Sequence, residues 1–310
     1  MAPNLIGNIS DSDNSGNENG GGVYLTGANT RLTIIDGNIV GNKTGGHGGA
    51  IAAENDATVS IQRSSSRCWN PAHCVFFSAN KAGEQNFGAG GAIFNSSATV
   101  TIKQATFEDN RADFGTVIYA TGLNSTTTIN SSIFNHNGAG GGNSGANGFS
   151  DNYVIRALSD AVVHVLSSTI ADNDVTLSVI GISASTTASS TVYSSIIYDA
   201  ASGPVFALGS TGYLTDCDLV HETGSFLSSG TSSVGNPMFV NSASRNYHIQ
   251  VSSPAVDGCD NFTHASDISD IDNESRGYDD PNHANTIGSY DIGADETLES
   301  DIIFKHGFEL

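Results

Sequence analysis

The chain has 310 residues, of which 36 are glycine and only 14% are charged, so it is poor in residues that favour helices. Asp and Glu number 32 against 11 Lys and Arg, which gives a formal net charge of −21. A protein this negative is repelled by phosphate backbones and anionic membrane surfaces, so we expect no nucleic-acid partner. No stretch approaches the about 20 apolar residues that a membrane span requires.

The first 22 residues are rich in Asn, Ser, Asp and Gly, and they contain neither a basic segment nor an apolar signal core. We interpret residues 1–22 as an N-terminal partial rung or a leader. The patterns described below then divide the rest of the chain into a solenoid over 23–250, an acidic cap over 251–298 and a tail over 299–310.

A Gly-rich start followed by an aliphatic residue recurs about every 25 residues. Two repeats are longer, and their excess falls in the loop-like stretches 62–75 and 138–149. Insertions of this kind on a regular period are typical of solenoids. The aligned aliphatic or small residues are Val23, Ala50, Ala92, Val117, Val154, Val179 and Val205.

A second apolar run follows each start by about 11 residues, as in 32–34, 59–61, 100–102 and 163–165. Its alternation places branched residues on one face and Thr, Ser or His on the other, which predicts strands. Regular two-residue hairpin turns are missing, so each strand is expected to pair in parallel with its equivalent one rung away. The sequence therefore predicts an all-β, single-stranded, right-handed parallel β-helix of about seven or more rungs. An irregular β-sandwich is the alternative fold.

A third element of the repeat ends with an apolar residue and an Asn three positions later. Asn at equivalent turn positions can stack as a ladder of amide hydrogen bonds, or it can simply tolerate left-handed turn geometry. The residues of this predicted ladder are Asn42, Asn80, Asn110, Asn137 and Asn173.

Four cysteines fall as two sequence pairs, Cys68 with Cys74 and Cys217 with Cys259. Three pairings are open in principle, and four free thiols are the alternative. We expect disulfides, because the composition suits an exported protein. The second pair would then tie the last rung to the cap.

Two parts of the chain resemble known families. The Gly-Gly-Ala-Ile start at 90–93 and the Phe-x-x-Asn end at 107–110 resemble repeats of polymorphic outer-membrane proteins, over about residues 21–200. The segments 253–257, 270–276 and 291–296 resemble the closing signature of bacterial right-handed β-helix proteins of the choice-of-anchor Q type. Asn273 stands where a Gly is usual, and Asp295 where an aromatic residue is usual. These resemblances imply a secreted or cell-surface location.

The predicted cap gathers many carboxylates close together in sequence. Hard oxygen ligands suit Ca²⁺, so Asp270, Asp272 and Asp291 are candidate calcium ligands, although the Gly-anchored pattern of calcium loops is missing. The alternative is a structural clamp in which Arg276 pairs with Asp291 or Glu296 and holds the cap over the last rung.

Many parallel β-helices degrade polysaccharides, so an active site has to be considered. Inverting glycosidases use paired carboxylates, and near pairs occur here as Asp109 with Asp113 and Asp172 with Asp174. Aspartate at turns also has a sufficient structural reason in its own hydrogen bonding. A glycoside hydrolase or polysaccharide lyase is therefore the alternative function.

The leading hypothesis is a non-catalytic, monomeric β-helix that contacts a polysaccharide or a cell-surface glycan. Loops held by a rigid scaffold concentrate binding residues, and Trp69, Phe76 and Phe87 near the first insertion are candidate stacking platforms for a sugar ring.

An ice-binding face would need an unbroken file of Thr, and Ser60 and His164 interrupt it.

Overall fold

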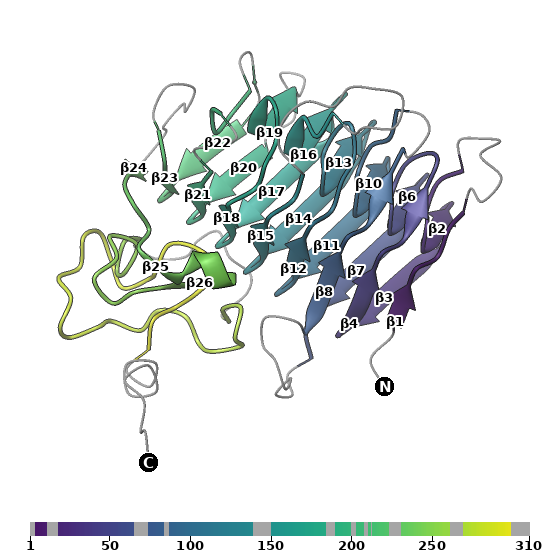
Figure 1. Cartoon of the computed structure of the whole chain (residues 1–310). Helices are drawn as coiled ribbons and strands as arrows, with labels where there is room; N and C mark the ends of the chain where they lie inside the picture. The colour runs from purple at the N-terminus through teal and green to yellow at the C-terminus, as the bar shows by residue number, and fades with distance from the viewer. Residues whose placement is uncertain are drawn as a thin grey trace.

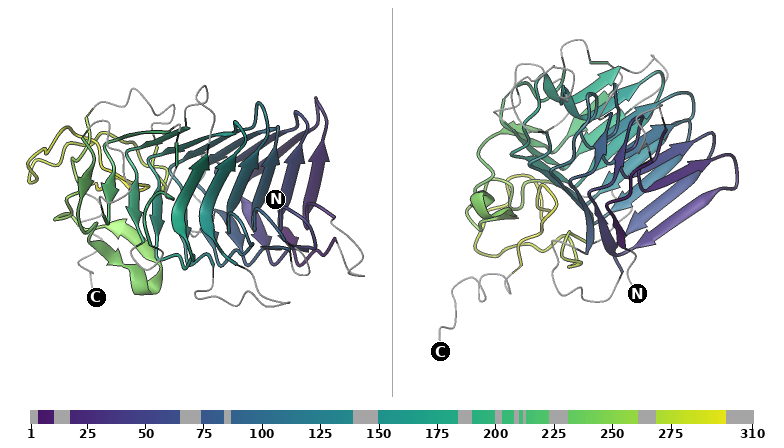
Figure 2. Two further views of the ribbon diagram at one scale, coloured as in Figure 1. Left: turned by 90° about the horizontal axis from the view of Figure 1, so that it is seen from above. Right: turned by 45° about the vertical axis from the view of Figure 1, so that its right-hand side comes forward.

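The computed structural model describes most of the chain and shows it as nearly all strand (Figure 1). Most strands lie in three sheets of nine, seven and six parallel strands. Successive coils stack along one axis (Figure 2). The predicted all-β parallel β-helix solenoid is thereby confirmed. The described residues are 4–10, 18–64, 74–83, 87–138, 150–183, 190–199, 203–207, 210–211, 213–222, 231–260 and 269–298.

Each coil contributes one strand to each sheet in turn, first the six-stranded, then the seven-stranded, then the nine-stranded sheet. The nine-stranded sheet has the order β1 (Asn4–Ile6), β4 (Gly37–Val40), β8 (Val75–Ser78), β12 (Thr106–Glu108), β15 (Ile133–Asn135), β18 (Thr169–Ala171), β21 (Ile196–Tyr198), β23 (Leu219–Val220) and β24 (Ser233–Val234). The seven-stranded sheet has the order β22 (Tyr213–Asp216), β20 (Ser190–Tyr193), β17 (Val162–Leu166), β14 (Thr126–Asn130), β11 (Thr99–Lys103), β7 (Thr58–Gln62) and β3 (Arg31–Ile35). The six-stranded sheet has the order β19 (Ser178–Ser183), β16 (Tyr153–Leu158), β13 (Ile118–Thr121), β10 (Ile93–Ser96), β6 (Ile51–Glu54) and β2 (Val23–Thr26).

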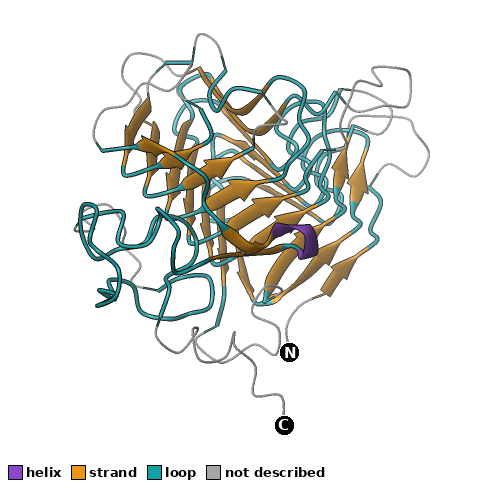
Figure 3. Ribbon diagram, turned by 60° about the vertical axis from the view of Figure 1, so that its left-hand side comes forward, coloured by secondary structure: helices purple, strands orange, loops and turns teal. Residues whose placement is uncertain are grey.

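In the described part of the chain, two short strand pairs and one 3-10 helix lie outside these sheets. Strands β5 (Lys43–Thr44) and β9 (Lys81–Ala82) pair in parallel at the turn between coils. Strands β25 (Phe239–Asn241) and β26 (Asn246–Ile249) pair antiparallel and are joined by the 3-10 helix η3 (Ser242–Ser244), the purple turn in Figure 3. Among the described residues, no helix has both the length and the apolar character needed to cross a membrane.

The corners of the coil explain why the sequence is rich in Gly, Asn, Asp and Ser. Most corners use residues with positive φ, a conformation that Gly adopts freely and that Asn and Asp tolerate better than other residues. Between the nine-stranded and six-stranded sheets the corner residue is Gly20, Gly48, Gly90 or Gly115, with φ of 75°, 72°, 69° and 60°. The chain can therefore turn from one short strand to the next without a hairpin.

The interior of the coil is filled by these alternating apolar residues. In β7, for example, Val59 and Ile61 are fully buried, while the residues on either side of them are partly exposed. Phe77, Phe107 and Phe134 occupy equivalent positions in successive coils and stack with ring centroids 4.9 and 4.8 Å apart. This stack gives the core a continuous aromatic file along the axis.

The predicted asparagine ladder is present next to this core. The Nδ2 of each Asn donates to Oδ1 of the next, at 2.9 Å for every step from Asn42 to Asn173. The ladder extends beyond the predicted residues at both ends. Asn8 donates to Asn42 at 2.7 Å, and Asn173 donates to Oδ2 of Asp199 at 2.9 Å.

One part of the predicted alignment is wrong by one residue. Val23 was aligned with Ala50, but it pairs with Ile51, which in turn pairs with Ile93. The positive-φ glycine at the corner sets the register, so Gly20 rather than Gly21 is equivalent to Gly48. The extra Gly in this first repeat concealed the shift.

The sequence predicts a C-terminal cap over the last turn of the coil. In the structure the cap also lies along the side of the coil. We define the cap as the described residues 236–260 and 269–298, because β25 and β26 pair only with each other and not with the coil. The cap reaches back along the solenoid as far as Arg63, at the end of β7, whose guanidinium donates to the carbonyl of Ile271 at 2.6 Å. It appears in green and yellow next to β15, β18 and β21 in Figure 1.

Candidate functional site

The cap binds one corner of the coil, which we call the docking corner. It follows the strands of the seven-stranded sheet, and its backbone has positive φ at residues such as Gln104, Ser131 and Ser194. Gln104 donates to the carbonyl of Asp270 and Ser131 to that of Ser269, at 2.5 and 2.8 Å. The residues of the docking corner are Arg63, Gln104, Ser131, Ser167, Ser194 and Cys217.

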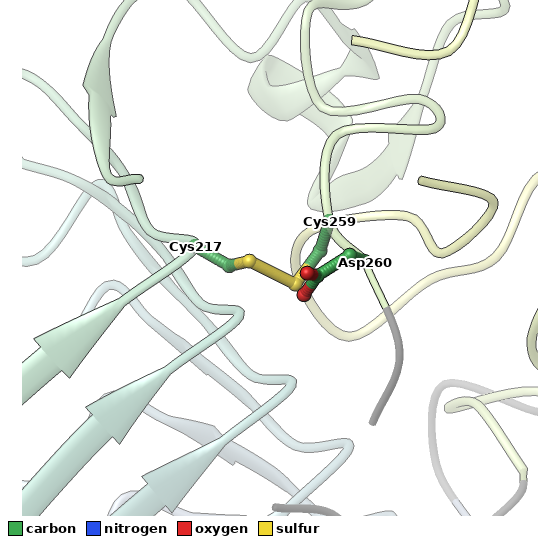
Figure 4. Close-up of side chains that lie close together, drawn as sticks. All are labelled: Cys217, Cys259 and Asp260. Carbon is green, nitrogen blue, oxygen red and sulfur yellow. A yellow bond between two sulfur atoms is a disulfide. The ribbon is translucent and has the colours of Figure 1, made fainter. Parts of the chain in front are cut away.

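A disulfide closes the far end of this contact. Cys217 of the docking corner is bonded to Cys259 of the cap, 42 residues later, as Figure 4 shows. Asp260 lies close to both sulfur atoms. Because the sulfurs are bonded to each other, this group is a covalent tie and not a metal site. Cys74 is also disulfide-bonded, and Cys68 lies outside the described residues.

The cap also covers the outer face of the nine-stranded sheet. Ile133 and Ala171 of that face are buried in one apolar cluster with Tyr247, Ile271 and Ala294 of the cap. A second cluster joins the strands β21 and β23 to cap residues around the disulfide. This part of the nine-stranded sheet is therefore closed to a large ligand.

The catalytic candidates are not gathered into one open site. Asp109 forms an ion pair with Arg245 of the cap at 3.0 Å, and Asp172 accepts a hydrogen bond from the hydroxyl of Tyr247 at 3.0 Å. Buried Asp113 accepts the backbone N–H groups of Gly88 and Ser150, and Asp174 is exposed. Each of the first three carboxylates thus has a structural partner.

Sequence reasoning missed the junction formed around Tyr247. Its hydroxyl lies 3.3 Å from Nδ1 of His136 as well as donating to Asp172. Burial, and next the charge of Asp172, raise the pKa of Tyr247 well above its usual value, so the phenol stays protonated and remains a donor. Arg245 also pairs with buried Glu108 at 2.5 Å. These contacts hold β25 and β26 against the coil.

The Arg276 clamp involves one of its two predicted partners. The guanidinium lies 3.6 Å from Oε2 of Glu296, and both side chains are almost fully buried. Of Asp291, the Arg276 guanidinium contacts the main-chain carbonyl, at 3.5 Å, and not the carboxylate. It also donates to the main-chain carbonyl of Ser167 in the docking corner. The clamp therefore holds the cap to the side of the coil.

The three candidate calcium ligands are mostly occupied by the backbone. Asp270 accepts the N–H groups of Asp272, Glu274 and Glu296, and Asp291 accepts those of Asp257 and Thr297. Burial, and next the charge of Asp295, raise the pKa of Asp270 to about 8. Burial, and next the charge of Glu296, raise that of Asp291 to about 8. Of the three candidates, Asp272 is the one grouped with other potential ligands, His248 and Asp295.

Two sheets of the solenoid retain outer faces outside these cap contacts. On the seven-stranded sheet the central outward file is mostly Thr and Ser, with His164 between Thr128 and Thr191. The imidazole of His164 is 2.8 Å from the Thr191 hydroxyl, and burial lowers its pKa. The remaining members of the file are Thr33, Ser60, Thr101 and Leu214.

The outer face of the six-stranded sheet carries aromatic side chains. Tyr24, Ala52, Phe94, Tyr119 and Arg156 occupy one register position across neighbouring strands. The rings of Phe94 and Tyr119 stack with centroids 5.8 Å apart. Arg156 lies over the ring of Tyr153 in the same strand, 4.7 Å from its centroid.

The turns that lead into this sheet add further aromatic groups. His47 stacks on Phe94 at 4.7 Å, and its Nδ1 accepts the backbone N–H of Ala89. Burial lowers the pKa of His47, which agrees with a neutral ring that accepts at Nδ1. Ala89 forms a backbone bridge with Phe114, so this turn lies beside that of the next coil. We name Tyr24, His47, Phe87, Phe94, Phe114 and Tyr119 the aromatic face.

The aromatic face contains one of the three predicted stacking residues. Phe87 is 76% exposed, and Tyr24 and Phe114 are 50% and 37% exposed. Phe76 lies instead on the nine-stranded sheet, in register with Asn38 and Thr106, and Trp69 lies outside the described residues. The sequence pattern could have predicted this face, because Phe94 and Tyr119 each lie two residues after the aligned residue of their repeat, Ala92 or Val117.

Comparison of the chain with family models, with curated proteins and with solved structures found no match in any of the three.

Proposed function

We propose that this protein is a non-catalytic, carbohydrate-contacting β-helix that acts outside the cell and binds a glycan through its aromatic face. The observation that carries the proposal is the set of exposed side chains of Tyr24, Phe87 and Phe114 on the sheet and turns that hold the stacked Phe94 and Tyr119. Aromatic faces pack against the C–H groups of sugar rings, and a ring held by a rigid sheet loses little conformational freedom on binding.

The charge of the protein narrows the class of glycan. A net charge of −21 repels uronate-rich and sulfated polymers. A neutral polysaccharide or a neutral surface glycan is therefore the ligand class that we propose. The disulfide between Cys217 and Cys259 supports an extracellular location, since such bonds persist in oxidising compartments.

The test is a binding panel of neutral and acidic polysaccharides, measured with the full chain. We expect binding to a neutral member and none to polygalacturonate or alginate. Replacing Phe87 or Phe114 by Ala should weaken binding by about tenfold each, which corresponds to about 1.4 kcal/mol per lost ring contact. Phe87 is 76% exposed, so its loss should leave the thermal unfolding midpoint nearly unchanged, whereas the loss of Phe114, which is 37% exposed, should lower the midpoint.

Leu123→Ala is the matched control, because Leu123 is 68% exposed and lies beyond the other end of β13. Its variant should bind like the wild type. Equal binding by all variants would exclude the aromatic face as the binding surface. The same incubations should be assayed for new reducing ends and for unsaturated uronates, because either product would replace this proposal with a polysaccharide-degrading enzyme.

A further inference from the structure

Three separate segments of the cap bring an imidazole and two carboxylates together. Strand β26 supplies His248, and the described stretch 269–298 supplies Asp272 from a turn near its start and Asp295 from near its end. One potential ligand atom from each residue lies within 4.8 Å of the other two. Nε2 of His248 is 2.7 Å from Oδ2 of Asp272 and 4.0 Å from Oδ1 of Asp295.

A hydrogen bond at Nδ1, the ring nitrogen that does not face the carboxylates, fixes the orientation of the His248 ring. Oδ1 of Asn246 accepts the backbone N–H of His248 at 3.1 Å, which identifies this amide atom as the oxygen. The same oxygen lies 2.6 Å from Nδ1 of the ring, so Nδ1 carries a proton. In the neutral imidazole the lone pair is then on Nε2, and it faces both carboxylates. A metal-binding histidine is usually held in this way, through a hydrogen bond from its other ring nitrogen.

The carboxylate of Asp295 is also held in place. Oδ2 of Asp295 accepts the N–H of Ile249 at 2.9 Å, which turns Oδ1 toward the imidazole. The Asp295 side chain is only 5% exposed, whereas those of His248 and Asp272 are 28% and 22% exposed. The group is therefore anchored on one side and open to solvent on the other.

A lone pair that faces two carboxylates is repelled unless a cation lies between them. A proton on Nε2 is one such cation, and it gives an ion pair with Asp272. A divalent metal ion is the other, and it can contact all three residues at once. One nitrogen and two oxygen ligands suit Zn²⁺ and similar first-row ions, whereas Ca²⁺ takes oxygen ligands.

We propose that His248, Asp272 and Asp295 bind one divalent transition-metal ion, which joins three segments of the cap. Nε2 of His248 and one oxygen of each carboxylate are the ligands, and solvent completes the coordination sphere. This set replaces the calcium ligands expected from the sequence, of which it retains only Asp272. Because bound metal stabilises the folded state alone, it should raise the thermal unfolding midpoint of the protein.

The test is calorimetric titration of the full chain with ZnCl2 after treatment with a chelator, together with thermal unfolding in the same buffers. We expect one Zn²⁺ ion per chain, a higher unfolding midpoint with the metal, and weaker binding at acidic pH because the ligands must be deprotonated. His248→Gln and Asp272→Asn should each weaken binding by more than about tenfold, and Asn246→Ala by about tenfold through the freed ring.

Asp279→Asn is the matched control, since Asp279 is an exposed carboxylate of the same cap. It should bind Zn²⁺ like the wild type. Asp272→Asn preserves the shape of the side chain, so it keeps the test open if His248→Gln does not fold. The proposal is overturned if Zn²⁺ binds equally to the wild type and to both ligand variants. Tighter binding of CaCl2, dependent on Asp272 but not on His248, would overturn it as well.

Discussion

The solenoid and the cap bury polar groups in different ways. In the solenoid most buried polar side chains are neutral hydroxyls and amides, and the ladder from Asn42 to Asn173 satisfies each of its amides with the equivalent amide in the next coil. In the cap they are mainly carboxylates, and the fully or nearly fully buried ones are Asp257, Asp270, Asp280, Asp291, Asp295 and Glu296.

The difference follows from repetition. A repeating coil offers every amide a donor and an acceptor at the same spacing, so neutral groups can satisfy one another. The cap has no repeat, and its irregular turns leave backbone N–H groups that need acceptors. Carboxylates such as Asp270 accept two or three of them, but burying charge is costly unless it is neutralised. We therefore expect the stability of the ladder to depend on individual contacts and the stability of the cap to depend on pH.

The largest effect is expected in the ladder. Asn110→Ala removes the acceptor for the backbone N–H and the amide of Asn80, and the donor to the carbonyl of Phe77. These groups stay buried without partners, so the variant should lose about 3 to 4 kcal/mol of unfolding free energy, measured by urea denaturation. Asn38→Ala is the control, because its side-chain hydrogen bond is exposed, and it should cost less than about 0.5 kcal/mol. Similar losses of unfolding free energy in the two variants would mean that the ladder contributes little to stability.

The ladder also shows how far the sequence carries a prediction. The strands, the insertions and the five ladder residues follow from a period, because each coil repeats the same local conditions. The first repeat was misaligned because three successive glycines, Gly20 to Gly22, leave the corner position ambiguous.

The sites in the cap could not be derived in the same way. His248, Asp272 and Asp295 come from three segments without any repeat, and the contact of Tyr247 with His136 spans 111 residues. Charge density alone pointed to Asp270 and Asp291, but it could not show that backbone N–H groups occupy both carboxylates. The position of the cap beside the coil depends on the docking corner, whose residues share only their place in the coil.

The second prediction concerns the pH dependence of the cap. The pKa of Asp270 is raised from 3.8 to about 8, so its contribution to stability is full below about pH 4 and is lost as the pH rises through about 8. Asp270→Asn cannot ionise. The difference in unfolding free energy between wild type and variant should therefore shift by about 2 kcal/mol against the wild type from pH 5 to about pH 6.5.

This shift is to be measured by urea denaturation with a chelator present, so that metal binding does not contribute. The pH dependence is the informative quantity, because the new amide also loses one acceptor oxygen for the N–H of Glu296. Asp279→Asn, at an exposed position, should follow the wild type across this range. A constant difference for Asp270→Asn between the two pH values would show that this carboxyl does not drive the effect.

The smallest effect is expected where the two regions meet. Arg245 is 39% exposed and pairs with Glu108 and Asp109 of the coil, so Arg245→Gln should cost about 1 kcal/mol. High salt should reduce this cost, because it screens partly exposed ion pairs. Arg31→Gln, on an exposed position of β3, should have no measurable effect. Cleavage of β25 and β26 by protease should become faster in Arg245→Gln while the solenoid stays intact. Unchanged cleavage would mean that Tyr247 and the apolar cluster around Ile133 hold the junction without the ion pair.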